Sequence, residues 1–168
     1  VYLVKTNSEG DSLWTKTFGG SDYDYGRSVQ QTTDGGYIIS GYTFSFGNGS
    51  TTDVYLVKTN SNGEEEWTKT FGGSDDDYGY SVQQTTDGGY IIGGNTDSFG
   101  NGYFKDVYLI KTNSEGDSLW TKTFGGSHDD YGRSVQQTTD GGYIISGITT
   151  SFGNGGDVYL VKTNSEGD

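Results

Sequence analysis

Cysteine, proline and methionine are all absent from this sequence. Without cysteine there are no disulfide bonds and no thiolate zinc sites, and the sequence does not determine the redox compartment. No run reaches about 18 apolar residues, so the sequence predicts no membrane-spanning helix. No basic segment followed by an apolar one marks a signal peptide. Because the chain starts at Val1 and contains no methionine, we expect it to be part of a longer polypeptide.

Basic residues are also scarce: ten Lys and Arg stand against 23 Asp and Glu, which gives a net charge of −13. Binding to phosphates needs clustered positive charge, so nucleic acid and anionic membrane surfaces are disfavoured as partners. An acidic surface suits a secreted protein and favours calcium as a ligand. High net charge with few aliphatic residues is also typical of disordered chains. Here, however, the apolar residues gather in short alternating runs of β-branched and aromatic residues, which predict strands.

What the sequence has in abundance is internal repetition. The string VYLVKTNSEGDSLWTKTFGG begins at Val1 and returns with few changes at Val54 and Val107, and its opening returns again at Val158. The spacings are 53, 53 and 51 residues. Such a period is typical of arrays of small structural units. We therefore treat residues 1–168 as part of one repeat domain. Its repeats are 1–53, 54–106 and 107–157, followed by a partial repeat, 158–168.

Each repeat contains four short segments with the composition of strands. In the second repeat they are Val54–Thr59, Trp67–Phe71, Tyr80–Thr86 and Tyr90–Thr96. The last two flank Asp87-Gly88-Gly89, a tight hairpin signal, and no segment has the apolar period of a helix. The predicted fold class is all-β, with four-stranded antiparallel sheets that repeat every ~53 residues like the blades of a β-propeller. A β-solenoid is the main alternative, although its coils are usually shorter and its strands parallel.

A single four-stranded sheet has two faces and cannot bury either of them alone. Face-to-face packing buries both, so such sheets are stable only in company. We expect thirteen strands, from the third strand of one blade to the third strand of another. Since propellers close with about four to eight blades, closure requires further blades. These come from the same longer polypeptide, which we favour, or from a second copy of the chain.

The segments WTKTFGG, SDDDYG, TTDGGYII, SFGNG and DVYLVKT resemble the SBBP-type (seven-bladed β-propeller) repeat over the whole chain. That family occurs in secreted and surface proteins of bacteria and archaea. The resemblance implies a propeller displayed outside the cell, often beside adhesion or anchoring modules. The stretch from each turn to its tryptophan also resembles the tryptophan-docking motif of quinoprotein propellers and the Asp-box. It departs from both patterns, and we infer no cofactor from it.

Aspartates recur in the loop after each Gly-Gly-Ser. Several carboxylates in a glycine-flanked loop can supply oxygen ligands to calcium. The calcium candidates are Asp22, Asp24, Asp75, Asp76, Asp77, Asp129 and Asp130. The alternative, which we favour, is that Asp24, Asp77 and Asp130 cap the loops by accepting hydrogen bonds from backbone N–H groups.

One tryptophan recurs in each repeat, at Trp14, Trp67 and Trp120. We expect these rings to pack between blades, because tryptophan buries a large area. The alternative is that sugars stack on exposed rings. The aromatic residues that would assist are Tyr42, Tyr103 and Phe104. The loop after SFGNG differs most between the repeats, and variable loops on a constant scaffold are where binding specificity usually lies.

Nothing in the sequence points to catalysis. His128 is the only histidine, and no nucleophile elbow of the G-x-S-x-G type accompanies it. The SFGNG loops lack the lysine and the following helix that phosphate binding needs. General acid–base catalysis needs one differentiated pair of carboxylates, whereas these sets are alike. We therefore expect no catalytic residues and no enzyme activity.

The predicted function is that of a non-enzymatic scaffold or adhesion module, outside the cell or on its surface. A lectin-like propeller that binds glycans is the first alternative. A glycosidase or lyase with its site in the central channel is disfavoured, because nearly identical blades supply no asymmetry. A designed or consensus repeat sequence without a natural function is a further alternative.

Overall fold

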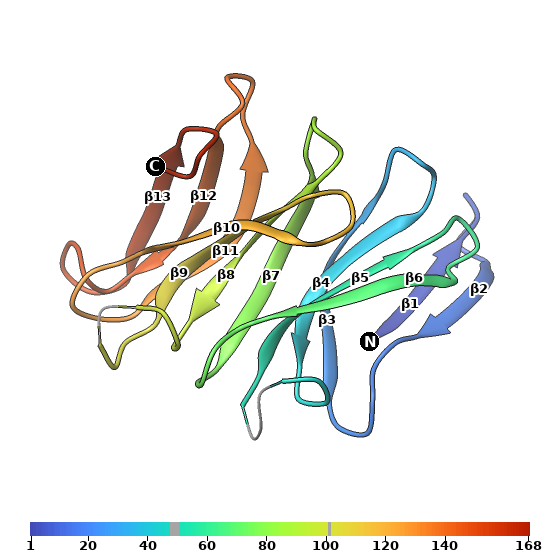
Figure 1. Ribbon diagram of the computed structural model, residues 1–168, viewed down its shortest axis with the longest axis horizontal. Helices are drawn as coiled ribbons and strands as arrows, with labels where there is room; N and C mark the ends of the chain where they lie inside the picture. The colour runs from blue at the N-terminus through green and yellow to red at the C-terminus, as the bar shows by residue number, and fades with distance from the viewer. Residues whose placement is uncertain (48–50, 101) are drawn as a thin grey trace.

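The structure is a computed structural model that describes residues 1–47, 51–100 and 102–168. The regular structure of these residues is all β, in antiparallel sheets whose strands follow one another in chain order (Figure 1). No described helix is long and apolar enough to cross a membrane.

The first sheet contains β1 (Tyr2–Thr6) and β2 (Ser12–Thr17). The second contains β3 (Asp24–Gln31), β4 (Tyr37–Thr43), β5 (Asp53–Thr59) and β6 (Glu65–Phe71). The third contains β7 (Asp77–Gln84), β8 (Tyr90–Thr96), β9 (Asp106–Thr112) and β10 (Ser118–Phe124). The fourth contains β11 (Asp130–Gln137), β12 (Tyr143–Thr149) and β13 (Asp157–Thr163).

The predicted strands are confirmed, with small shifts at their ends. β7 begins at Asp77, three residues before the predicted start, because the bend after Gly-Gly is shorter than the polar composition of the loop suggested. The sheets begin at Asp24, Asp77 and Asp130, so they are offset from the sequence repeats by two strands. All strand pairings of the described part of the chain are antiparallel, which a solenoid of parallel strands would not show. Parts of the SFGNG loops, at 48–50 and 101, lie outside the described residues.

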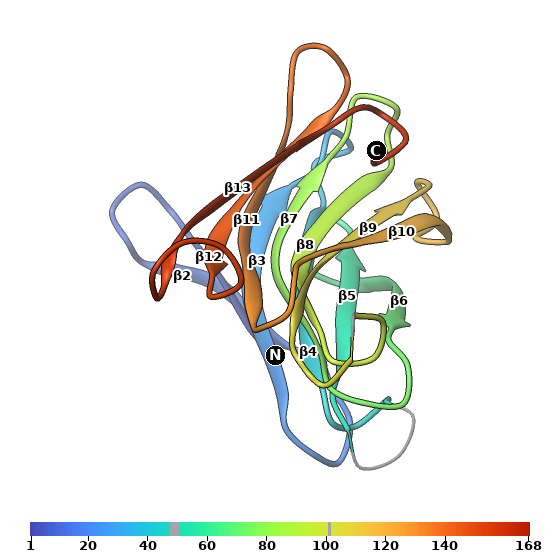
Figure 2. The ribbon, with the colours of Figure 1, turned by 90° about the vertical axis from the view of Figure 1, so that its left-hand side faces the viewer.

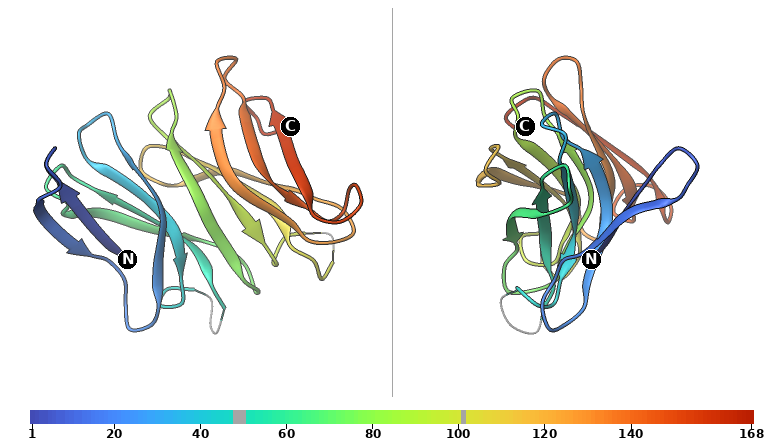
Figure 3. Two further views of the ribbon diagram at one scale, coloured as in Figure 1. Left: turned by 180° about the vertical axis from the view of Figure 1, so that it is seen from behind. Right: turned by 90° about the vertical axis from the view of Figure 1, so that its right-hand side faces the viewer.

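The four sheets stack face to face, as the view from behind shows most clearly (Figure 3, left). Alternate residues of β5 belong to different cores. Val54 and Leu56 pack with residues of the third sheet, while Tyr55 and Val57 pack with residues of the first. Because successive side chains of a strand point to opposite faces of the sheet, β5 contributes to two separate cores. Both faces of the second sheet are therefore buried, because a neighbouring sheet covers each of them.

Burial here depends on the neighbouring sheet rather than on the local sequence. Asp53–Thr59 and Asp157–Thr163 are both DVYLVKT, yet β5 is buried at every position and β13 is mostly exposed. Leu56 has 0% of its surface exposed, whereas Leu160 has 62%. The difference arises because β13 lies in a sheet that is covered on one face only. This contrast supports the view that the sheets are stable only when stacked.

The first strands of the second, third and fourth sheets, β3, β7 and β11, lie side by side (Figures 1 and 2). Side-chain amides join them, since Gln84 N–H donates to Gln30 Oε1 and Gln137 N–H donates to Gln83 Oε1, both at 2.6 Å. The same bond therefore recurs one repeat later with the same length. Glutamine at this position satisfies backbone donors that the sheet itself leaves free.

Buried lysines hold the tight hairpins, which project at the top of Figure 1. Lys58 Nζ lies 2.8 Å from Asp34 Oδ2 and 2.7 Å from Glu66 Oε2, and it also donates to Thr59 O at 3.0 Å. The bond from Lys58 lowers the pKa of Asp34 to about 2. Burial alone would lower the pKa of Lys58, but the two carboxylates raise it above its usual value. The charged forms of both partners are thus the stable ones in the folded chain.

Candidate binding surface

The connections between sheets and the long loops after the second strands lie at the same end of the stack, opposite the tight hairpins. We call this end the loop edge. Its described residues are 18–23, 44–47, 51–52, 72–76, 97–100, 102–105, 125–129 and 150–156. The recurring aspartates and the loops that vary between repeats both lie here. The loop edge is therefore the part of the surface on which the repeats differ from one another.

The last aspartate of each set caps its loop, as predicted. In each case Oδ2 accepts a hydrogen bond of 2.8 Å from a glycine N–H four residues earlier: Gly20 to Asp24, Gly73 to Asp77 and Gly126 to Asp130. Asp77 and Asp130 are completely buried. Burial raises the pKa of Asp77, since desolvation outweighs the hydrogen bonds from Ser98, Thr96 and Gly73. Because these carboxylates hold their own loops through hydrogen bonds, their role is structural.

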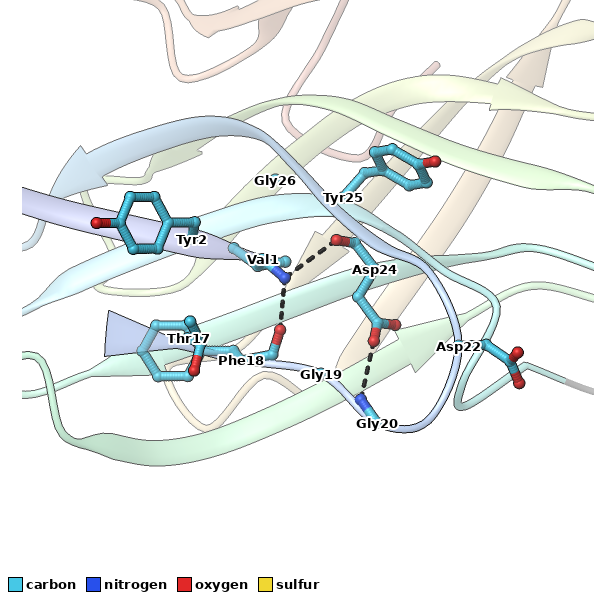
Figure 4. A pocket seen from close by; sticks show the side chains of 10 residues that line it. All are labelled: Val1, Tyr2, Thr17, Phe18, Gly19, Gly20, Asp22, Asp24, Tyr25 and Gly26. Carbon is cyan, nitrogen blue, oxygen red and sulfur yellow. Dashed lines mark hydrogen bonds between the residues drawn. The ribbon is translucent and has the colours of Figure 1, made fainter. Parts of the chain in front are cut away.

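Figure 4 shows the first of these loops, with Asp24 facing Gly20 and with Asp22 pointing away from it. Burial would raise the pKa of Asp24, but hydrogen bonds from Thr43, Gly20 and Ser45 lower it overall. A pocket of about 630 Å³ opens here beside β1. In the other sheets a second strand occupies the equivalent place, as β4 does beside β5. The pocket therefore lies where the other sheets have a paired strand. For this reason we assign no ligand to it.

The middle aspartate of a set ties two sheets together. Asp76 Oδ1 accepts from Thr52 N–H at 2.8 Å and from Thr52 Oγ1 at 3.0 Å, and Tyr78 OH donates to Asp76 Oδ2 at 3.1 Å. Burial would raise the pKa of Asp76, but these bonds lower it overall. Asp129 repeats the pattern, since its Oδ1 accepts from Lys105 N–H at 2.9 Å. Sequence alone did not separate this role from capping, because the two positions are adjacent.

The first position of each set is exposed. Asp75 Oδ2 accepts a bond of 3.1 Å from the neighbouring Ser74, and His128 lies beside Ser127 in the same way. The three positions of a set, which are all aspartate only at Asp75–Asp77, therefore have three different surroundings. Among residues 1–47, 51–100 and 102–168, no three acidic or histidine side chains are gathered into a metal-binding group. The candidate calcium ligands are thus not brought together by the described structure.

We expect the melting temperature to be unchanged by EDTA, because hydrogen bonds to Asp24, Asp77 and Asp130 hold the loops without a metal. A ligand that binds only the folded state would raise its stability, and removing that ligand would lower it. Thermal melts of chelated and calcium-supplemented protein make the comparison. A fall of several degrees in EDTA that calcium reverses would contradict the capping role and restore the calcium hypothesis.

Comparison with known proteins assigns this chain to no established family. The chain matches no protein-family model. It is similar to the regulatory protein FlaEY of Caulobacter vibrioides, with 25% identity over 153 residues. The similarity covers 77% of this chain but only 16% of FlaEY, so the chain corresponds to a small part of that protein. The resemblance to SBBP-type repeats therefore stays a prediction.

The tryptophans lie between successive sheets. Trp67 meets Tyr90 of the third sheet edge to face, with ring centroids 5.8 Å apart, and its ring also covers Gly116. Trp14 meets Tyr37 at 5.8 Å and Trp120 meets Tyr143 at 5.7 Å in the same manner. These are the contacts expected of packing between sheets. They leave each ring only partly accessible, which does not favour sugar stacking on the tryptophans.

Of the three assisting aromatic residues, Tyr42 is buried, whereas Tyr103 and Phe104 are exposed on the loop edge. Tyr103 lines a pocket of about 480 Å³ together with Thr51, Asp75, Asp76, Asp97, Ser98 and Gly102. An exposed ring beside carboxylate and hydroxyl oxygens has the chemistry of a site for a hydroxylated ligand such as a sugar. This pocket joins loops of two successive sheets.

Sequence reasoning missed one feature of the first strands. The pairing of β7 with β8 shifts register between Gly79 and Ser81, which leaves Tyr80 as the extra residue of a β-bulge. Arg27 and Arg133 are the extra residues of the equivalent bulges in β3 and β11. A bulge redirects a side chain, and it often does so beside a functional site. The glycines that flank each bulge, inside an otherwise β-branched and polar strand, were the available signal.

Proposed function

We propose that this chain is a run of blades from a β-propeller that acts outside the cell as a non-enzymatic scaffold or adhesion module. The observation that carries the proposal is the recurrence of one set of contacts between sheets. The bonds from Gln84 to Gln30 and from Gln137 to Gln83 have the same length, and the tryptophan contacts repeat as well. Repeating one contact set repeats one rotation, which leads either to a ring or to an open superhelix. Four-stranded antiparallel sheets are typical of the ring.

The division of the repeats into constant and variable parts supports a scaffold. The residues that join sheets are the same from repeat to repeat, for example Gln30 and Gln83, which accept the same bond from the next sheet. The loop edge, by contrast, has STT, YFK and G at the equivalent place. Constant packing with variable loops is the usual arrangement of repeat proteins that present a binding surface. Each set of aspartates has the same structural role in its loop, which does not favour an active site.

Imaging of particles tests the architecture. We expect class averages from electron microscopy to show a closed ring, formed either by a longer polypeptide that carries these repeats or by several copies of the chain. Light scattering on the same sample gives the mass and therefore the number of chains. An open column of sheets that lengthens without closing would contradict the propeller, whatever the binding function.

A lectin-like function is the second candidate, and the pocket beside Tyr103 favours it. Its carboxylates accept hydrogen bonds from hydroxyl groups, and the tyrosine ring offers a face on which a sugar can stack. A glycan array probed with the intact chain tests this function. Binding above background supports it, whereas a uniformly blank array removes it and leaves the scaffold role in place.

A further inference from the structure

A continuous line of tyrosine and arginine side chains crosses the strands β3, β7 and β11 and includes one residue of β4. We call it the Tyr–Arg ladder, and it consists of Tyr25, Arg27, Tyr42, Tyr78, Tyr80 and Arg133. Tyr25 stacks on Tyr42 at 4.8 Å, Tyr42 meets Tyr78 edge to face at 4.9 Å, and Tyr78 stacks on Tyr80 at 6.2 Å. The bulges position the two arginines and Tyr80 at equivalent places.

Each arginine lies over two tyrosine rings. The Arg133 guanidinium is 4.7 Å from the ring of Tyr80, on the preceding sheet, and 5.1 Å from that of Tyr131. The Arg27 guanidinium is 5.1 Å from the ring of Tyr42 and donates a bond of 2.6 Å to its hydroxyl. Stacking of this kind fixes the plane of a guanidinium without using most of its N–H donors. Both arginines are exposed, so those donors are accessible.

The arginines differ from most lysines in their partners. Within the described ranges, neither Arg27 nor Arg133 forms an ion pair with a carboxylate. Six lysines do form such pairs: Lys58, Lys69, Lys105, Lys111, Lys122 and Lys162. In a chain with 23 acidic residues, two oriented guanidinium groups without a carboxylate are an unusual feature. A planar guanidinium with free donors matches a carboxylate in bidentate geometry.

We propose that the Tyr–Arg ladder binds sugars that carry a single carboxylate, such as a glycan ending in a uronic acid. The arginine binds the carboxylate, and the accessible tyrosines beside it, Tyr25 and Tyr80, contact the sugar ring, whereas the buried Tyr42 supports Tyr25 from below. The ladder is continuous with the loop edge, because Tyr78 OH donates to Asp76, which lines the pocket beside Tyr103. The proposal rests on the lectin-like function and specifies its ligand.

The charge of the chain limits the ligand to few negative groups. A net charge of −13 repels polyanions over the distance of a Debye length, which is about 8 Å at physiological ionic strength. A mostly neutral glycan with one carboxylate experiences little of this repulsion and still reaches the arginine. Heparin-like chains and acidic peptides carry many charges and are excluded by the same reasoning. The hydroxyl groups of the neutral part suit the tyrosine hydroxyls.

Binding of a matched pair of oligosaccharides tests the proposal: one ends in glucuronic acid and the other in glucose. By calorimetry on the intact chain, we expect the uronate to bind at least about ten-fold more tightly, as a charge-assisted bidentate contact allows. Arg133→Gln and Arg27→Gln are expected to weaken uronate binding and to leave glucose binding unchanged. Tyr80→Leu is expected to weaken both. Lys122→Gln removes the same charge from an exposed lysine paired with Asp168, and it should change neither.

The outcomes separate the ladder from the wider function. Equal affinity for the two sugars would overturn the ladder as a carboxylate site and leave a neutral-sugar lectin intact. Tighter binding of polyglutamate or heparin than of the uronate would also overturn it. If neither sugar binds while particles still form rings, the ladder and the lectin fail but the scaffold stands. Melting curves of each variant check that the fold is retained, which we expect for the arginine variants because both side chains are exposed.

Discussion

Replacing Trp67 with alanine is expected to lower the free energy of unfolding by about 3–5 kcal/mol, which is typical of large aromatic residues in a core. Trp67 packs against the core between the second and third sheets and meets Tyr90 edge to face. Its ring also lies against Gly116, in the turn between β9 and β10. Its removal therefore leaves a cavity at the contact between two sheets. Denaturant titration of the variant and the parent chain measures the loss as a lower midpoint with an unchanged slope.

Leu119→Ala is the matched control. Leu119 precedes Trp120 in β10, but 58% of its surface is exposed, so its truncation should change the free energy of unfolding by no more than about 0.5 kcal/mol. If Trp67→Ala costs no more than Leu119→Ala, the tryptophan does not join the sheets. The description of Trp67 as a residue that packs between sheets would then be wrong.

Strands and turns were predictable because their signals are local. The turn Asp87-Gly88-Gly89 with its flanking runs predicted the hairpin between β7 and β8, and the alternation of apolar residues in Val54–Thr59 predicted β5. Burial was less accessible to sequence reasoning, since it depends on what covers a sheet. The identical strands β5 and β13 show this, as one is buried on two faces and the other on one.

Part of the candidate surface was also predictable. An aspartate in a glycine-flanked loop commonly accepts backbone hydrogen bonds, and Asp24, Asp77 and Asp130 do so. The partner of Asp76 was not predictable, because Thr52 belongs to the preceding sheet and lies 24 residues away. From the sequence alone, Arg27 is likewise predicted to be only an exposed cation in a polar strand. Its position over two tyrosines becomes visible only when β3 is paired with β4 in the bulged register.

The glycines opposite the bulges are expected to tolerate no side chain. Gly94 pairs with Gly79 across the bulge, and a Cβ added to Gly94 would lie 1.7 Å from the carbonyl oxygen of Tyr78. Because the obstacle is backbone, relief requires β7 to move away from β8. We expect Gly94→Ala to destabilise the chain by about 3 kcal/mol, at the upper end of the usual range for overpacking. Denaturant titration measures this loss.

Gly88→Ala separates this clash from backbone strain. Gly88 has a φ of 85°, but nothing lies within 4 Å of an added Cβ, so alanine there should cost only about 1–2 kcal/mol through its left-handed conformation. If Gly94→Ala were no worse than Gly88→Ala, the close approach of β8 to Tyr78 would be contradicted.

The movement of β7 also has a consequence for binding, because Tyr78 connects Tyr42 to Tyr80 in the Tyr–Arg ladder. Any Gly94→Ala protein that still folds should therefore bind the uronate sugar less tightly, whereas Gly88→Ala, in the distant hairpin, should leave that affinity unchanged.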